Sequence, residues 1–246
     1  MSPKSTRKGH YLERDRSWHP EALTPNYKSS IYRSPSSKLI SFPTTLSEET
    51  GPVFGHDILG SLDSDLIHNY ARQGQAAIGS RIIIHGRLLD EFERPVPGAL
   101  IEVWQANSGG RYRHKNETYL AALDPNFSGC GRTITDENGD YEFITIMPGP
   151  YPWPNGPNEW RPAHIHFSVF GNAFAQRLIT QMYFEGDPLI QKCPIVATLN
   201  SLTAVKRLTG FLDMERTIPM DSLAYKFDIT IRGKQQTVFE NKPEGL

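Results

Sequence analysis

Six segments of the chain alternate apolar and polar residues with the period of two that is typical of half-buried β-strands. They span residues 81–89, 99–104, 141–146, 164–170, 178–183 and 225–232. Between two β-prone stretches, the pair Asn138-Gly139 is a strong signal for a tight hairpin turn. Strands of this length, separated by turns and accompanied by few helices, predict an all-β fold, an antiparallel β-sandwich with short helices.

Two further segments have features of helices. Residues 63–73 predict one short helix, with Asp63 or Ser64 as its N-cap. Residues 201–213 repeat apolar positions three or four residues apart, which predicts a helix that packs one face. These apolar positions are Leu202, Val205, Leu208 and Leu212.

Residues 1–50 differ from the rest of the chain, since they contain ten Ser and five Pro and show no sustained periodicity. Such a segment is either disordered or an arm that orders against another surface. The aromatic residues from Tyr11 to Tyr32 favour an extended N-terminal arm, because disordered tails are usually poor in aromatic residues. We therefore divide the chain into residues 1–75, the arm with the short helix, and residues 76–246, the β-sandwich domain.

The charge is nearly balanced, with 26 basic and 27 acidic side chains and a formal net charge of −1. This balance argues against a nucleic-acid partner and against a polybasic surface for membranes. No apolar run approaches the roughly 20 residues of a membrane-spanning helix, and no apolar stretch follows the basic start of the chain, so we expect no secretory signal. Two cysteines argue against a disulfide framework. We expect a soluble, cytoplasmic protein.

Candidate chemistry begins in the strand expected at residues 164–170. Alternate residues of a strand share a face, so the apolar set Ile165, Phe167 and Val169 faces the core. His164 and His166 then share the opposite face, where their imidazoles can converge on one metal ion. A His-x-His pair also occurs on ordinary surface strands, so this pattern alone leaves both interpretations open.

Two loops rich in Gly and Pro contain tyrosines that could join these histidines. Residues 147–157 hold Tyr151 between prolines, which stiffen the loop, and residues 107–114 hold Tyr112 after two glycines. The alternative interpretations are that residues 147–157 are a packed loop that caps the sandwich and that residues 107–114 are an ordinary exposed loop. Phenolate and imidazole ligands together suit trivalent iron, whereas zinc more often takes Cys, His and carboxylates. Spacing alone does not select these two tyrosines among the ten.

From about Ile78 to its end, the chain resembles the intradiol ring-cleavage dioxygenases, non-haem iron(III) enzymes that split catechols between the two hydroxyl-bearing carbons. The motifs that carry the resemblance are GRLLDEFERPVPGALIEVWQANSGGRYRH, LDPNFSGCGRTITDENGDYEF, GPYPWPNGPNEWRPAHIHF and ITQMYFEGD. The segment RDRSWHPEALTPNYKSSIYRSP resembles the β chains of the protocatechuate 3,4-dioxygenase branch of this family.

The resemblance implies roles for ten residues. The expected ligands of Fe(III) are Tyr112, Tyr151, His164 and His166. The same comparison makes Tyr151 the ligand that substrate displaces, and implies catalytic roles for Arg161 and Gln181. The expected substrate-binding residues are Tyr27, Trp104, Trp153 and Ile195.

The resemblance also implies substrates and a partner. The expected reaction is iron(III)-dependent intradiol ring cleavage of protocatechuate with O2. A homologous α chain is expected to complete the pocket, with the αβ units assembling further. Catechol and hydroxyquinol are rival substrates. A non-catalytic sandwich module of the transthyretin-like kind shares the Pro-Val-x-Gly-Ala signature but lacks the two tyrosines and the His-x-His pair, which argues against it.

Overall fold

The computed structural model describes residues 26, 28, 30–33, 58–171, 177–199, 201–233 and 236–238. Most of the expected N-terminal arm, Tyr27 included, lies outside these described residues, so the division of the chain at residue 75 stays a prediction. Within the arm, α1 (Ser30–Arg33) is a single helical turn. In the described part of the chain, no helix is long and apolar enough to cross a membrane.

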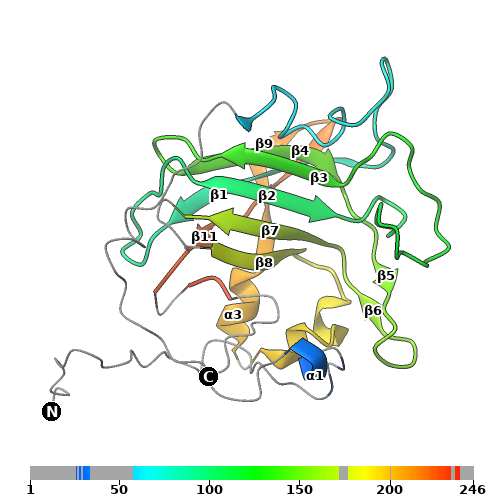
Figure 1. Cartoon of the computed structure of the whole chain (residues 1–246). Coiled ribbons are helices and arrows are strands. Elements are labelled where there is room, and N and C mark those ends of the chain that lie inside the picture. Colours follow the sequence, from blue (N-terminus) through cyan, green and yellow to red (C-terminus); the bar gives the residue numbers. More distant parts are fainter. Residues whose placement is uncertain are drawn as a thin grey trace, which may run out of the picture.

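One sheet of nine strands folds over itself into two layers (Figure 1). The first layer comprises β3 (Cys130–Ile134), β2 (Leu100–Gln105), β7 (His164–Phe170) and β8 (Arg177–Phe184). The second layer comprises β4 (Asp140–Ile146), β1 (Arg81–Leu89), β10 (Ser222–Lys226) and β11 (Ile229–Thr230). The layers are joined by β9 (Thr209–Ile218), which pairs with both β8 and β10. A separate small hairpin consists of β5 (Tyr151–Pro152) and β6 (Trp160–Arg161).

The structure confirms the all-β prediction, and the strands predicted at 81–89 and 164–170 coincide with β1 and β7. The pairing is mixed rather than purely antiparallel, because β1 runs parallel to β10 and β11 and β8 runs parallel to β9. Alternation of apolar residues reports which face of a strand is buried and carries no information about strand direction, so the parallel pairs were not predictable from the pattern.

The prediction of a helix over residues 63–73 is wrong. This segment forms consecutive turns instead. Its backbone pairs with the edge of β4, where Leu66 N donates to Ile144 O and Ile144 N donates to Ser64 O. These bonds to a neighbouring strand replace the bonds within the segment that a helix would make.

The helix predicted over residues 201–213 is correct only in its first half. Helix α3 (Leu202–Arg207) begins at an N-cap serine, Ser201, whose side chain accepts a hydrogen bond from Ala204 N. From Thr209 onward the chain continues as β9 beside β8. The strand predicted over 225–232 is likewise divided between β10 and β11.

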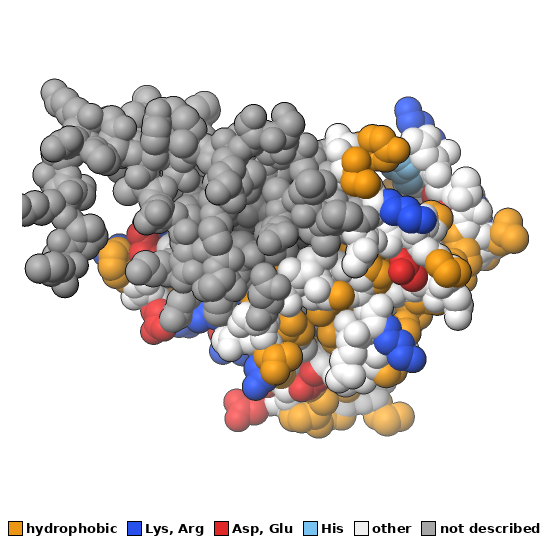
Figure 2. All heavy atoms as spheres, turned by 90° about the horizontal axis from the view of Figure 1, so that it is seen from below, with side chains coloured by type: hydrophobic (Ala, Val, Ile, Leu, Met, Phe, Trp, Pro, Cys, Tyr) orange, Lys and Arg blue, Asp and Glu red, His pale blue; other side chains and the backbone are white. Residues whose placement is uncertain are grey.

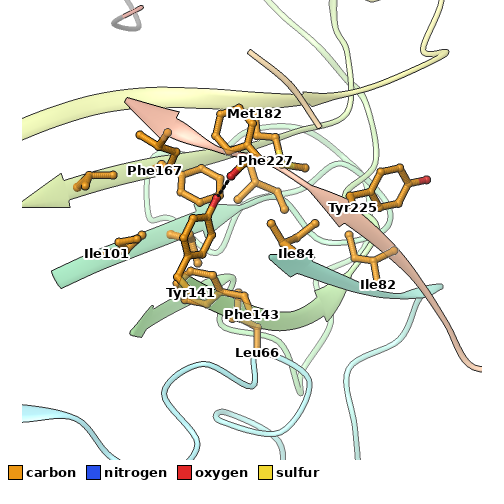
Figure 3. Packing of buried hydrophobic residues seen from close by; sticks show 14 of the residues in the cluster. Leu66, Ile82, Ile84, Ile101, Tyr141, Phe143, Phe167, Met182, Tyr225 and Phe227 are labelled. Atoms are coloured by element: carbon orange, nitrogen blue, oxygen red, sulfur yellow. Dashed lines mark hydrogen bonds between the residues drawn. The ribbon is translucent and has the colours of Figure 1, made fainter. Parts of the chain in front are cut away.

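The larger of two apolar clusters fills the space between the layers (Figure 3). Phe167 of β7 is completely buried there and contacts the rings of Phe143 and Phe227. The Tyr141 hydroxyl donates to the Phe227 carbonyl oxygen across this core, as the dashed line in Figure 3 shows. The apolar face of β7 therefore faces the core, as the sequence predicted, and its histidine face points away from it.

A second, smaller apolar cluster includes part of β8 and the segments that follow it. Besides α3, these segments contain two short 3-10 helices, η2 (Ile190–Lys192) and η3 (Val196–Thr198). The buried members of the cluster are Tyr183, Cys193, Ile195, Val196, Ala204, Leu208 and Val238. On the face of the molecule seen in Figure 2, acidic and basic side chains are interspersed among the described residues, as the balanced charge predicts.

Candidate metal centre

The two histidines of β7 are both buried, with His164 only 2% exposed and His166 9% exposed. The Nδ1 atom of His164 lies 2.6 Å from the carbonyl oxygen of Pro162, so the proton of the neutral ring sits on Nδ1 and the lone pair on Nε2. Burial, together with the positive charge of Arg161, holds the pKa of His164 well below its usual value of 6.5. His164 is therefore a neutral imidazole, the form that binds metals.

Two tyrosine hydroxyls converge on these imidazoles. The Tyr112 hydroxyl oxygen lies 3.0 Å from His166 Nε2 and 3.4 Å from His164 Nε2. The Tyr151 hydroxyl oxygen lies 3.4 Å from His164 Nε2. The structure thus brings together all four residues that the sequence comparison implied as ligands.

Close packing of the two glycine-containing loops explains how these tyrosines meet. Gly110 has a positive φ of 80°, and a Cβ atom there would lie 2.2 Å from the carbonyl oxygen of Pro150. A Cβ atom at Gly149 would lie 2.5 Å from Gly110 N. The loops of Tyr112 and Tyr151 therefore approach backbone to backbone, a contact that only glycine permits at these positions.

The chemistry of the four donors fits a hard, trivalent metal ion. In the described part of the chain, no group of three or more His, Cys, Asp or Glu side chains gathers where it could hold a metal ion. The four residues Tyr112, Tyr151, His164 and His166 provide two imidazole nitrogens and two phenol oxygens instead. Phenol oxygens become hard anionic ligands once a metal lowers their pKa. The donor set therefore suits ferric iron and differs from the common zinc sets.

Next to the donors lies a buried polar network. Arg161, 3% exposed, donates from Nη2 to Gln181 Oε1, and the same nitrogen is 3.4 Å from the Tyr183 hydroxyl. The Tyr183 hydroxyl donates to Gln181 Oε1 over 2.9 Å. This network orients the guanidinium group. Arg161 lies beside the donor set because it pairs with Tyr151 of β5 in the small hairpin.

Tyr183 is a residue that the sequence analysis missed. In the register of β7 and β8, it lies opposite His164, while Gln181 lies opposite His166. The available signal was its position two residues after Gln181, which places both side chains on one face of the strand. That signal becomes specific only when the pairing of the two strands is known.

The residues expected to bind substrate have different surroundings. The Trp104 ring stacks on His166 with the ring centroids 4.8 Å apart and the planes 4° from parallel. The Arg161 guanidinium lies 5.6 Å from the centre of the Trp153 ring. Ile195 belongs to the second apolar cluster, and Trp153 packs against that cluster. Tyr27 lies outside the described residues.

A cleft of about 340 Å³ adjoins Trp104 on the side of β3. Its lining includes Cys130 and Arg132 and none of the four donor residues. The chemistry assembled around His164 therefore does not take place in this cleft.

Comparison with known proteins identifies the family. The family model described as Dioxygenase matches residues 49–233, which is most of the chain. The chain belongs to the intradiol dioxygenase family. A second model, described as Protocatechuate 3,4-dioxygenase beta subunit N terminal, matches residues 12–45 of this dioxygenase, so the predictions of the family and of its β-chain branch are confirmed.

Individual relatives agree with this assignment. The dioxygenase is 47% identical over 227 residues to the protocatechuate 3,4-dioxygenase beta chain of Burkholderia cepacia, which covers 92% of this chain and 96% of that protein. It is 41% identical over 120 residues to catechol 1,2-dioxygenase 1 of Acinetobacter lwoffii, covering 44% of this chain and 37% of that protein. The fold is similar to that of hydroxyquinol 1,2-dioxygenase from Pseudomonas putida DLL-E4, with a TM-score of 0.50 and 23% identity over 83% of this chain and 70% of that chain.

Proposed function

We propose that this intradiol dioxygenase is the iron-carrying β-type chain of a protocatechuate 3,4-dioxygenase. It uses O2 to cleave protocatechuate (3,4-dihydroxybenzoate) between the two hydroxyl-bearing carbons, giving 3-carboxy-cis,cis-muconate. The observation that carries this proposal is the convergence of two tyrosine hydroxyls on two buried imidazoles, in a chain 47% identical to a relative named as such a β chain.

Tyr112, Tyr151, His164 and His166 would hold the ferric ion. When bound, this ion acts as a Lewis acid that withdraws electron density from a catecholate and prepares the ring for reaction with O2. Two phenolates offset most of its charge, and the imidazole of His164 adds none because it is held neutral. Trp104 stacks on His166 and keeps the plane of that ring fixed.

Tyr151 is the proposed base. Its phenolate oxygen accepts a proton from a substrate hydroxyl when the substrate takes its place near the ion. Tyr151 lies on the short strand β5, which is paired with the rigidly bonded Arg161 of β6. This hairpin guides the side chain back after product leaves, whereas Tyr112 stays in place.

Arg161 is the proposed electrostatic catalyst. Its guanidinium is fixed by Gln181 and Tyr183 and is buried, so its charge acts on the ring with little screening by water. A preorganised cation of this kind stabilises negative charge that develops on the ring during attack by O2. Trp153 and Ile195 provide the apolar side of the pocket, and Tyr27 of the arm is proposed to contact the substrate as well.

The decisive experiment is an absorption spectrum of the purified protein before and after addition of protocatechuate. Ligation of ferric iron by tyrosinate predicts a red-brown protein whose visible band shifts when the substrate binds. Metal analysis should find iron. A colourless, fully active protein that contains zinc would overturn the proposal.

Catechol and hydroxyquinol are the rival substrates, because the chain is also similar to dioxygenases named for them. Steady-state turnover of the three diols by the same preparation separates the candidates. We expect the highest kcat/KM for protocatechuate. A higher kcat/KM for catechol would keep the chemistry and change the substrate.

A further inference from the structure

The loop that joins β5 and β6 contains an asparagine with unusual surroundings. Asn155 lies at the tip of this hairpin and is only 5% exposed. The turn is tight, since Asn155 N donates to Trp153 O and Trp153 N donates to Glu159 O, both over 2.8 Å. The base of the same hairpin carries Tyr151 and Arg161.

The side chain of Asn155 is bonded to a segment far away in the sequence. Its Oδ1 accepts a hydrogen bond from Lys28 N over 2.9 Å. Its Nδ2 donates to Asn26 O over 2.9 Å and to Glu159 Oε2 over 2.8 Å. One buried amide thus uses both of its N–H groups and its oxygen, and two of its three partners belong to the backbone of the N-terminal arm.

Glu159 determines which way this amide points. A carboxylate only accepts hydrogen bonds, so the atom of Asn155 that faces it must be the nitrogen. The oxygen then faces Lys28 N, and the second N–H of the amide faces Asn26 O. The amide therefore matches one donor and one acceptor of the arm backbone, as a neighbouring strand would.

We propose that Asn155 is a positioning residue that holds the N-terminal arm against the β5–β6 hairpin and thereby supports substrate binding. Asn26 and Lys28 are the neighbours of Tyr27 in the sequence. Asn155 thus ties the arm, on both sides of the expected substrate-binding tyrosine, to the hairpin of Tyr151 and Arg161. The support of substrate binding rests on the proposed function, whereas the attachment of the arm to the hairpin does not.

The test combines two variants with two measurements on the full-length protein. Asn155→Ala removes all three hydrogen bonds, and Asn155→Asp keeps the size of the side chain but replaces both donors with a charged oxygen beside Glu159. Loss of two arm bonds should increase the rate of trypsin cleavage after Lys28 and Arg33 by about tenfold, measured by mass spectrometry. The KM for 3,4-dihydroxybenzoate should rise about tenfold, with kcat and the visible spectrum nearly unchanged.

Asn116→Ala is the matched control, because Asn116 is an exposed loop asparagine whose side chain has no bond to the arm among the described contacts. It should change neither measurement. Unchanged cleavage in both Asn155 variants would overturn the proposal. Faster cleavage with unchanged KM would overturn the role in substrate binding, and a loss of the visible band together with kcat would show a structural role in the hairpin instead. If the parent protein, assayed together with its α chain, does not turn over 3,4-dihydroxybenzoate, the proposed function fails, while the cleavage rates still decide whether Asn155 holds the arm.

Discussion

At the scale of single residues, the site depends on hydrogen bonds between buried polar side chains. Arg161, Gln181 and Tyr183 are all nearly inaccessible to solvent. A buried cation is costly unless its hydrogen bonds are made, and Gln181 Oε1 is the acceptor that both Arg161 and Tyr183 share. Tyr183 therefore acts on the site through the orientation of its neighbours.

Removing the Tyr183 hydroxyl tests this role. Tyr183→Phe deletes the donor to Gln181 while keeping the ring, so the guanidinium of Arg161 loses part of its orientation. We expect kcat/KM to fall about tenfold, the loss of one hydrogen bond, with the iron content unchanged. Tyr70→Phe, at a half-exposed ring, is the control. An unchanged kcat/KM in Tyr183→Phe would show that Gln181 alone holds the arginine.

The two tyrosines of the donor set should respond differently to loss of their hydroxyls. Tyr151→Phe should keep iron bound, because Tyr151 is the donor that substrate displaces and the other three donors stay in place. It should slow substrate binding or product release by removing the displaceable base. Tyr112→Phe should weaken iron binding more. Metal analysis and stopped-flow absorption measure both effects. Complete loss of iron in Tyr151→Phe with retention in Tyr112→Phe would reverse the two roles.

At the scale of elements, β1 and the segment between β10 and β11 approach very closely. A Cβ atom at Gly86 of β1 would lie 1.9 Å from the carbonyl oxygen of Phe227, which also accepts the Tyr141 hydroxyl bond. Phe227 N in turn donates to His85 O. Gly86 thus allows the short segment between β10 and β11 to lie against β1.

Gly86→Ala should therefore destabilise the fold. The added methyl group would force apart two backbones and disturb the buried bond of Tyr141, at a cost of about 3 kcal/mol in the free energy of unfolding. Urea denaturation measures this difference. Gly60→Ala is the control, since its Cβ would meet only side-chain atoms of Asp63, the nearest at 3.2 Å, and no backbone atom. Equal unfolding midpoints for the two variants would contradict the close approach.

β1 also carries a buried histidine that should make stability depend on pH. Burial, and then the charge of Arg216, lower the pKa of His85 from its usual 6.5, while Asp213 and Glu142 act in the opposite direction. Because the unfolded chain binds this proton more readily than the folded chain, the contribution of His85 favours the folded state most above about pH 6.5 and becomes less favourable as the pH falls below it.

His85→Gln removes this titration. The loss of stability between about pH 7.5 and about pH 5.5 should be smaller in the variant than in the parent protein. Urea unfolding at both pH values measures it, and His114→Gln, at an exposed histidine, is the control. A loss of the same size in His85→Gln and in the parent would show that His85 does not contribute.

At the scale of the whole molecule, the donor residues come from three separate parts of the chain that one fold brings together. β7 supplies the histidines, the loop after β2 supplies Tyr112, and the β5–β6 hairpin supplies Tyr151. In Figure 1, α1 of the arm lies at the same end of the molecule as β5 and β6. The arm contacts and the site therefore share one end of the structure.

The proposed partner belongs to this scale. We expect the chain to need a homologous α chain for a complete pocket, and the resulting αβ units to assemble further. Purification of this chain alone and together with such a chain, followed by size-exclusion chromatography and activity assays, tests the expectation. Co-purification should raise kcat/KM for protocatechuate at least about tenfold. Full activity of the isolated chain would refute the need for a partner.

Much of the fold and of the site was predictable from the sequence. The boundaries of β1 and β7, the two faces of β7 and the convergence of its histidines follow from a period of two. The two tyrosines of the donor set and Arg161 required more, namely the resemblance to the dioxygenase family, because a residue type and a loop composition do not specify which side chains a residue will meet. The turns at residues 63–73 show the opposite case, where contacts with β4 overrode the local preference.

By itself, the sequence determined which residues face inward and which chemical groups are available, because side-chain periodicity and composition are local properties. Only the tertiary structure decided which strands run parallel, which tyrosine meets which histidine, and that Tyr183 and Asn155 belong to the surroundings of the site. These facts depend on contacts between residues far apart in the chain. Such contacts depend on strand register and on the close approach of glycine-containing loops, and neither is encoded in any single segment.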